Sequence, residues 1–336
     1  MPLKLVLQFT ARLISGLELF FVLSGFLVAG LLFREHRARG TVHLGRFLVR
    51  RAFKIYPAFY VFLCVSVAVS ASSSVFPSVT LPQVVAEAAF AQSYVRGIWS
   101  HTWSLAVEEH FYLLLAGVFA WLCVRSSNPT FAEVPRFTAV VCGGCLIARI
   151  VTTIMVPEFD FWVHLAPTHL RLDSLACGVL LAYWHHYHRP VVTSWMAAHR
   201  TSFAVAAAVL LFSAAVVPKA TAIGHTVLQV MQYIGHGAVI LLAVYCPSLE
   251  RLYCSTIGVA LQWIGRYSYS TYLWHMPVLA LSNAAVGGAY APDLSAAMYG
   301  ALCMPVGWVT AKAVEMPFLA CRERYFPSAL GGHRCD

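Results

Sequence analysis

The sequence predicts an all-α polytopic integral membrane protein, a helical bundle of about nine transmembrane helices. Of its 336 residues, 60% are apolar and only 11% are charged, whereas charged residues make up about a quarter of an ordinary soluble domain. The mean hydropathy is +0.71. Several windows reach the roughly 20 apolar residues that cross a bilayer as a helix. Alternating ten-residue strand patterns, typical of a membrane β-barrel, are missing.

The expected spans follow one another with short gaps, and the chain has no internal repeat and no low-complexity linker. One membrane domain over residues 1–336 is therefore predicted, with a tail at residues 319–336. The apolar run at the start is too long for a cleavable signal and lacks a cleavage site, so it is predicted to be a span. The nine spans are residues 13–33, 55–71, 103–124, 137–156, 168–184, 201–218, 225–246, 267–285 and 296–318.

Basic residues are distributed unequally between alternate gaps. One set of gaps with the C-terminal tail holds sixteen Lys and Arg residues, and the other holds about five. Because the richer side faces the cytoplasm, the C-terminus is predicted inside and the N-terminus outside a cell inner (plasma) membrane. The net charge of +9 is explained by these gaps, so a nucleic-acid partner is not expected.

The ten cysteines do not suggest a metal site or a redox motif. Cys142 and Cys145 are the most suggestive pair, but a metal would need two more close ligands. Most of the others fall within or beside apolar spans. They are predicted to be small packing residues, and no metal is expected.

Two adjacent carboxylates, Glu108 and Glu109, stand near the start of an apolar span in the stretch TWSLAVEEHFY. If Trp103 marks the outer interface, Glu108 lies about 7.5 Å deeper at about 1.5 Å per residue. Charged groups in a bilayer are costly and usually face the interior of the bundle, so a proton carrier or general base is predicted. The alternative is a structural carboxylate that caps the helix or pairs with an arginine.

Glu18, Arg171 and Asp173 reach the same outer half of the membrane under this topology. The sequence therefore predicts a polar cluster, in which Arg171 pairs with Glu108 or Glu109 because an isolated arginine would be costly there. The alternative is that Arg171 extends to the outer interface and has no partner in the bundle.

His275, in the stretch IGRYSYSTYLWHMP, is expected near the middle of the membrane. It is a candidate catalytic residue, but a hydrogen-bonded packing histidine is the alternative. Pro277 follows closely and indicates locally irregular backbone.

The run LVRRAFKIYP carries Arg50, Arg51 and Lys54 at the inner side of a span. Membrane topology alone explains such a run. The alternative is that these three side chains bind the phosphates of an anionic ligand or nucleotide.

Taken together, these segments resemble acyltransferase family 3, the membrane-bound O-acyltransferases that modify lipopolysaccharide sugars, Nod factors, macrolides and similar acceptors. The resemblance covers nearly the whole chain and keeps the family's order of motifs. The motifs are GLELFFVLSGFL, RRAFKIYP, TWSLAVEEHFY, RLDSLACG, YSYSTYLWH and VEMPF.

The resemblance implies a ten-helix core that transfers an acyl group, usually acetyl from cytoplasmic acetyl-CoA or another acyl-CoA, to a hydroxyl of a carbohydrate, glycolipid or small-molecule acceptor. Arg50, Arg51 and Lys54 would bind the CoA phosphates. Specificity is expected in short loops such as residues 72–101. The implied catalytic residues are Glu108, Glu109, Arg171, Asp173 and His275, and the implied acceptor contacts are Glu18, Trp103, Ser104 and Tyr272.

The sequence departs from the family pattern at its start. The family's first helix normally carries an arginine and, about ten residues later, a catalytic histidine, whereas only fifteen residues precede Gly16 and none is histidine. Either the chain begins too far downstream or it is a shortened, inactive member. Glu18 also stands where aspartate is commoner, and Lys54 where arginine is commoner.

Two other functions compete with the enzyme. A proton-coupled transporter would also carry buried carboxylates, although the missing inverted repeat weighs against it. A catalytically inactive acyltransferase-like protein is the third possibility.

Overall fold

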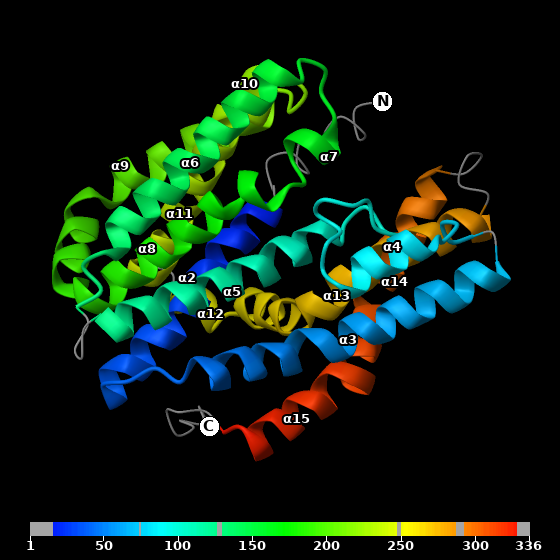
Figure 1. The fold of residues 1–336 in the computed structure, drawn as a ribbon, viewed down its shortest axis with the longest axis horizontal. Helices are drawn as coiled ribbons and strands as arrows, with labels where there is room; N and C mark the ends of the chain where they lie inside the picture. The colour runs from blue at the N-terminus through cyan, green and yellow to red at the C-terminus, as the bar shows by residue number, and fades with distance from the viewer. Residues whose placement is uncertain (1–15, 74, 126–129, 247–249, 287–291, 328–336) are drawn as a thin grey trace. The chain divides into compact units, whose positions relative to one another are not determined.

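The computed structural model describes residues 16–73, 75–125, 130–246, 250–286 and 292–327 (Figure 1). These residues form helices and connecting turns, with no β-strand among them. The sequence predicts that the family's first helix is missing before Gly16. That prediction falls on residues 1–15, which lie outside the described ranges. The all-α, multi-pass class is confirmed.

Each of the nine predicted spans overlaps a helix, but the helices over 201–218 and 267–285 begin at Arg189 and Thr256, twelve and eleven residues before the predicted starts. Within the described ranges, seven segments are long and apolar enough to cross a membrane. The predicted spans 168–184 and 267–285 correspond to α8 (Leu172–Tyr187) and α13 (Thr256–Val286), which are not among the seven. The seven are α2 (Gly16–Arg39), α3 (Leu44–Ser72), α5 (Trp103–Arg125), α6 (Val134–Met155), α9 (Arg189–Val216), α11 (Val227–Tyr245) and Asp293–Tyr325.

The chain divides into two compact units. Unit 1 comprises residues 1–42 and 107–250, and unit 2 comprises residues 43–106 and 251–336. Unit 1 contains α2, α6, α8, α9, α11 and most of α5, with the short helices α7 (Phe161–His164) and α10 (Ala222–His225). Unit 2 contains α3, α4 (Leu81–Ala88), α13, α14 (Pro292–Thr310) and α15 (Met316–Tyr325), and all but the first residue of the short helix α12 (Glu250–Tyr253).

In unit 1, α2 and α8 pack side by side (Figure 1) at two glycines. A Cβ built on Gly178 would lie 2.1 Å from the Val22 carbonyl oxygen, and one on Gly25 would lie 2.0 Å from the Leu175 carbonyl oxygen. Two backbones can approach this closely only where side chains are absent. The motifs GLELFFVLSGF and RLDSLACG are therefore joined through their glycines.

The rest of unit 1 is packed by apolar and aromatic side chains. Val22 of α2 belongs to one cluster with Leu181, Met196, Tyr233, Ile240 and Leu241 from α8, α9 and α11. Towards the other end of α2, Phe33 lies 5.3 Å from both Phe119 and Phe131, measured between ring centroids. These contacts hold α2 among its neighbours in unit 1.

In unit 2, α3 begins at Leu44 and not near residue 55 as predicted. The predicted boundary was wrong because hydropathy detects only the apolar part of the helix, and Pro57 looked like a helix start. Pro57 instead lies inside α3. Arg50, Arg51 and Lys54 are therefore helical, and Arg50 and Lys54 are separated by about one turn.

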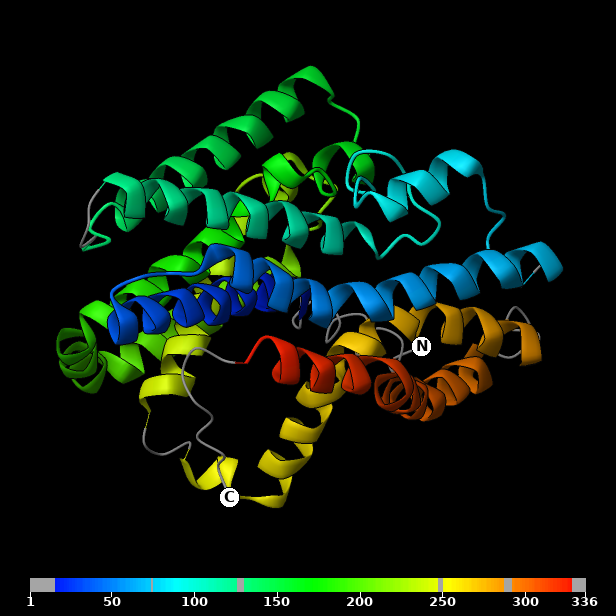
Figure 2. The same ribbon diagram turned by 60° about the horizontal axis from the view of Figure 1, so that its bottom comes forward.

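The C-terminal part of unit 2 is one long segment with a local change of helix type. A π-helical turn, Ala311–Glu315, joins α14 to α15. The predicted tail at residues 319–336 thus begins inside α15. Figure 2 shows α15 in red beside α3, and the two helices are in contact.

Candidate active site

The first polar cluster of unit 1 joins α2 to α8. Arg171 forms an ion pair with Glu18, and the Ser174 hydroxyl donates to the other Glu18 oxygen at 2.7 Å. Glu18 and Arg171 are only 3% and 4% exposed. In the loop after α9, burial lowers the pKa of Lys219, Arg171 lowers it further and Glu18 opposes both effects. Glu18 is thus a carboxylate held by a buried arginine.

The structure therefore brings Glu18 and Arg171 together, as the predicted polar cluster required. The partner it shows for Arg171 is Glu18, on α2. The predicted pairing of Arg171 with Glu108 or Glu109 stays a prediction.

A second buried ion pair crosses from α6 to α8. Arg149 Nη2 donates to Asp173 Oδ2 at 2.7 Å, and both side chains are almost completely buried, at 0% and 1% exposure. The other terminal nitrogen of Arg149 donates to Gln229 Oε1 and to the Leu170 carbonyl, each at 2.9 Å. Asp173 is thus paired with a buried arginine that joins α6 to α8, and its predicted catalytic role stays a prediction.

Glu108 and Glu109 are both buried, at 4% and 8% exposure. The Tyr112 hydroxyl lies 3.2 Å from Glu108 Oε2, as expected for residues four apart on one helix face. The same hydroxyl lies 2.7 Å from Ser24 Oγ on α2. Glu108 is therefore tied, through Tyr112, to the helix that carries Glu18.

In unit 2, a histidine pair forms where the loop before α5 meets α13. The ring centroids of His101 and His275 are 4.6 Å apart. The Tyr272 hydroxyl lies 2.6 Å from Ser104 Oγ and donates to the His101 carbonyl at 2.6 Å. Trp103, which directly precedes Ser104 in the chain, is also buried, at 5% exposure. His275 and Tyr272, both predicted site residues, are thus in one polar cluster with Ser104.

The same loop encloses a buried carboxyl group, Glu87 at the end of α4. Its Oε1 accepts from the Thr102 hydroxyl at 2.7 Å and from the Ile98 N–H at 3.1 Å. Burial raises the pKa of Glu87 to about 7, and these hydrogen bonds act against the rise. The backbone wraps so tightly that a Cβ on Gly97 would lie 2.3 Å from Oε1. Glu87 therefore fixes the loop that leads to His101.

This raised pKa predicts a pH dependence of stability. Folded Glu87 keeps its proton up to about pH 7, whereas the unfolded chain loses it near the usual glutamate pKa of 4.5. The folded state binds the extra proton in that window, so stability falls as pH rises from about 4.5 to about 7, by up to roughly 3 kcal/mol. The variant Glu87→Gln should abolish this fall, which thermal unfolding in detergent across the window would measure.

The matched control is Glu133→Gln, because Glu133 lies in a half-exposed pair with Arg136. Glu133→Gln should still lose stability as pH rises, as the unchanged protein does. A Glu87→Gln protein whose unfolding temperature still drops over this pH window would contradict the assignment.

The basic run of α3 faces carboxylates from the C-terminal segment. Lys54 forms an ion pair with Glu315, which also accepts from the Ser270 hydroxyl at 2.7 Å. Arg50 Nη2 donates to Glu323 Oε1 at 2.8 Å, and its Nη1 donates to the Phe326 carbonyl. Glu315 is buried, whereas Glu323 is about half exposed. An anion reaching Arg50 would therefore exchange with Glu323.

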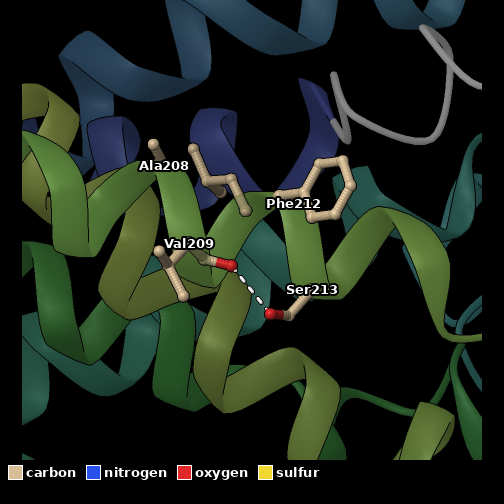
Figure 3. Close-up of a pocket in the computed structure, with 5 residues that line it drawn as sticks. Ala208, Val209, Phe212 and Ser213 are labelled. Atoms are coloured by element: carbon tan, nitrogen blue, oxygen red, sulfur yellow. Dashed lines mark hydrogen bonds between the residues drawn. The ribbon is translucent and has the colours of Figure 1, made fainter.

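The described residues also contain apolar pockets, which differ from these clusters. Figure 3 shows one on α9, about 560 Å³ in volume, lined by Ala208, Val209, Leu211, Phe212 and Ser213. Its polar feature, the Ser213 hydroxyl, already donates to the Val209 carbonyl at 2.8 Å. Such a lining offers no acid, base or anion-binding group.

Comparisons with known proteins decide the family. The model of acyltransferase family 3, described as "Acyltransferase domain", matches residues 7–312. The chain belongs to acyltransferase family 3.

Curated relatives in this family include O-acetyltransferases. The chain is 27% identical over 291 residues to peptidoglycan O-acetyltransferase OatA of Listeria monocytogenes serovar 1/2a, which covers 80% of this chain and 45% of the relative. It is 26% identical over 302 residues to O-acetyltransferase OatA of Staphylococcus aureus strain NCTC 8325, covering 80% and 46%. The chain thus spans about half the length of these relatives. No solved structure matches.

Among the residues of this acyltransferase family 3 chain, sequence reasoning missed Arg149, His101 and Glu87. Arg149 was detectable, because a charged residue inside the predicted span 137–156 requires a buried partner. His101 lies in a loop and Glu87 in the short helix α4, and both fall outside the predicted spans, where hydropathy predicts nothing about burial. Within the described residues no group of three or more metal-ligating side chains comes together.

Proposed function

We propose that this chain is a membrane-bound O-acyltransferase that moves an acyl group, most simply acetyl, from cytoplasmic acyl-CoA to a hydroxyl of an envelope carbohydrate. The observation that carries the proposal is the family match over residues 7–312, with relatives named as O-acetyltransferases. The Lys/Arg distribution supports a cytoplasmic C-terminus and an inner or plasma membrane.

Peptidoglycan is the first acceptor to test, because the Listeria relative is named for it. Sugars of glycolipids such as lipopolysaccharide are the second. Both present hydroxyls on a carbohydrate, so the reaction is the same and only the acceptor contacts differ.

The donor would be held by its phosphates. Arg50, Arg51 and Lys54 lie on the helical start of α3, and charge-assisted hydrogen bonds from such groups are the usual means of holding phosphate. The acids that face Arg50 and Lys54 support an anion-exchange site, in which CoA phosphates displace the half-exposed Glu323.

The chemistry requires a base for the hydroxyl and a donor for the developing oxyanion. The acceptor oxygen attacks the thioester carbonyl carbon, the C–S bond breaks, and the hydroxyl proton passes to the base and then to the CoA thiolate. His275 is our candidate base, and Tyr272 and Ser104 stay predicted acceptor contacts beside it. Trp103 stays a predicted acceptor contact.

In this proposal, the buried charged residues of unit 1 have two kinds of role. Asp173 is held in one buried ion pair, and Glu18 and Arg171 form another; these three residues position helices and substrate. Glu108 and Glu109 stay predicted proton carriers, because intramembrane carboxylates commonly move protons.

The experiment is transfer from radiolabelled acetyl-CoA in membranes that contain the chain. We expect alkali-labile label in peptidoglycan, and a fall of about 100-fold with Glu108→Gln or Glu109→Gln if either is the proton carrier. Full activity of both variants would remove that role from the pair. Proton-coupled solute uptake without transfer would point to a transporter.

The donor site makes a separate prediction. Replacing Arg50 with glutamine removes a charge-assisted contact to phosphate, so the KM for acetyl-CoA should rise about tenfold with little change in kcat. Arg136→Gln is the control, because Arg136 is 81% exposed and pairs with Glu133, three residues earlier. Equal KM values for the two variants would place the phosphates elsewhere.

A further inference from the structure

Helix α13 has a gap in its own hydrogen bonding, created by Pro277. Proline has no N–H, so the carbonyl four residues earlier, that of Leu273, loses its partner within the helix. Leu273 is fully buried, at 0% exposure, and a buried carbonyl without a partner is costly. In this structure the Leu273 carbonyl lies 3.2 Å from Nε2 of His101. A side chain from the preceding loop thus completes α13 at the proline.

This contact fixes the hydrogen positions on His101. A carbonyl oxygen only accepts, so Nε2 carries the proton. Burial, then the neighbouring His275, lower the pKa of His101 to about 3, against the effect of the Leu273 bond. The ring is therefore neutral at physiological pH and places no positive charge beside His275.

His101 also holds the residues on either side of Leu273. The Tyr272 hydroxyl donates to the His101 carbonyl at 2.6 Å, and the His101 ring packs on His275 at 4.6 Å. His275 Nδ1 lies 2.6 Å from the Tyr272 carbonyl, so Nδ1 carries the hydrogen and Nε2 keeps the lone pair. His101 thus contacts three residues of the turn 272–275, namely Tyr272, Leu273 and His275.

We propose that His101 is a positioning residue, which holds the proline-broken turn 272–275 so that Nε2 of His275 accepts the proton of the attacking hydroxyl. The inference rests on the proposed acyl transfer. In that step the ester C–O bond forms, the thioester C–S bond breaks, and His275 passes the proton to the departing thiolate. Loss of the His101 bond leaves the turn free to shift, and a shift of about 1 Å at a reacting group can cost about 100-fold in rate.

Two replacements of His101 separate the effect of its hydrogen bond to the Leu273 carbonyl from the effect of losing the imidazole ring. Glutamine places an amide N–H where Nε2 stood, and asparagine is too short to reach the Leu273 carbonyl. We expect His101→Gln to keep kcat within about threefold, and His101→Asn to lower kcat between about 10-fold and 100-fold with KM little changed. The assay is acetyl-CoA transfer in membranes, with thermal unfolding measured on the same preparations.

The stability control is Ser295→Ala. It removes a buried hydrogen bond from Ser295 to Asn283, which lies on α13 away from the turn. We expect Ser295→Ala to lose about as much thermal stability as His101→Asn and to keep kcat unchanged. A kcat loss of equal size in Ser295→Ala would mean that His101 acts only through stability and would overturn the inference.

A second background tests the proline argument. Pro277→Ala restores an N–H for the Leu273 carbonyl, so the defect of His101→Asn should shrink at least about threefold there. If His101→Asn lowers kcat as much in the Pro277→Ala background as in the original chain, the positioning role alone is overturned. The same holds if His101→Asn does not lower kcat at all. An unchanged chain that transfers no acetyl overturns the proposed function and this inference with it.

Discussion

Replacing Arg149 by leucine is expected to destabilise the fold by about 3 to 5 kcal/mol, the usual cost of removing one partner from a buried ion pair. Asp173, with 0% exposure, would be left as a buried carboxylate without its cation. Gln229 and the Leu170 carbonyl would lose their donor as well. Thermal unfolding in detergent, and the amount of protein recovered from membranes, would measure the loss.

The control for Arg149→Leu is Arg136→Leu on the same helix. Arg136 is 81% exposed and pairs with the half-exposed Glu133, so its replacement should cost less than about 1 kcal/mol. Adding Asp173→Asn to Arg149→Leu should recover part of the stability, since the uncompensated charge is then removed. Equal stability of the Arg149 and Arg136 variants would contradict the assigned network.

The second large effect is expected from Gly178→Ala. A single methyl group there would lie 2.1 Å from the Val22 carbonyl oxygen and 2.6 Å from the Phe26 nitrogen. Both atoms belong to the backbone of α2, so no side chain can rotate away and the two helices must separate. We expect a loss of at least about 3 kcal/mol, at the upper end for overpacking, together with loss of the Glu18–Arg171 ion pair that spans the same helices.

Gly144→Ala on α6 is the matched control, because a Cβ there meets nothing within 4 Å. Alanine is the better helix former, so this change should leave stability equal or raise it by about 0.5 to 1 kcal/mol. Thermal unfolding of both proteins in the same detergent is the measurement. If Gly178→Ala is as stable as Gly144→Ala, the close packing of α2 on α8 is wrong.

The fold was predictable from sequence to the extent that apolar length determines it. All nine expected spans overlap helices, because a bilayer-length apolar run leaves the backbone few alternatives. The start of α3 was not predictable, since its first turns are basic and Pro57 lies inside the helix. The π-helical turn before α15 leaves no trace in hydropathy.

The site was predictable in residue type and less so in partners. Glu18, Arg171, Glu108 and His275 are polar residues in apolar spans, and the structure buries or partly buries each of them. The pairing of Arg171 with Glu18 depends on the glycine contact of α2 with α8, which one sequence does not reveal. His101 escaped notice because its role follows from Pro277, which lies 176 positions further along the chain.

The most direct test of the proposed acyl transfer is its mass balance. Membranes that contain the chain are supplied with acetyl-CoA carrying a labelled acetyl group, and both the CoA thiol released and the alkali-labile acetyl ester formed on carbohydrate are counted. We predict equal amounts of the two, and loss of both with His275→Ala. Thiol release without ester, or ester formation that is the same in membranes without the chain, would contradict the proposal.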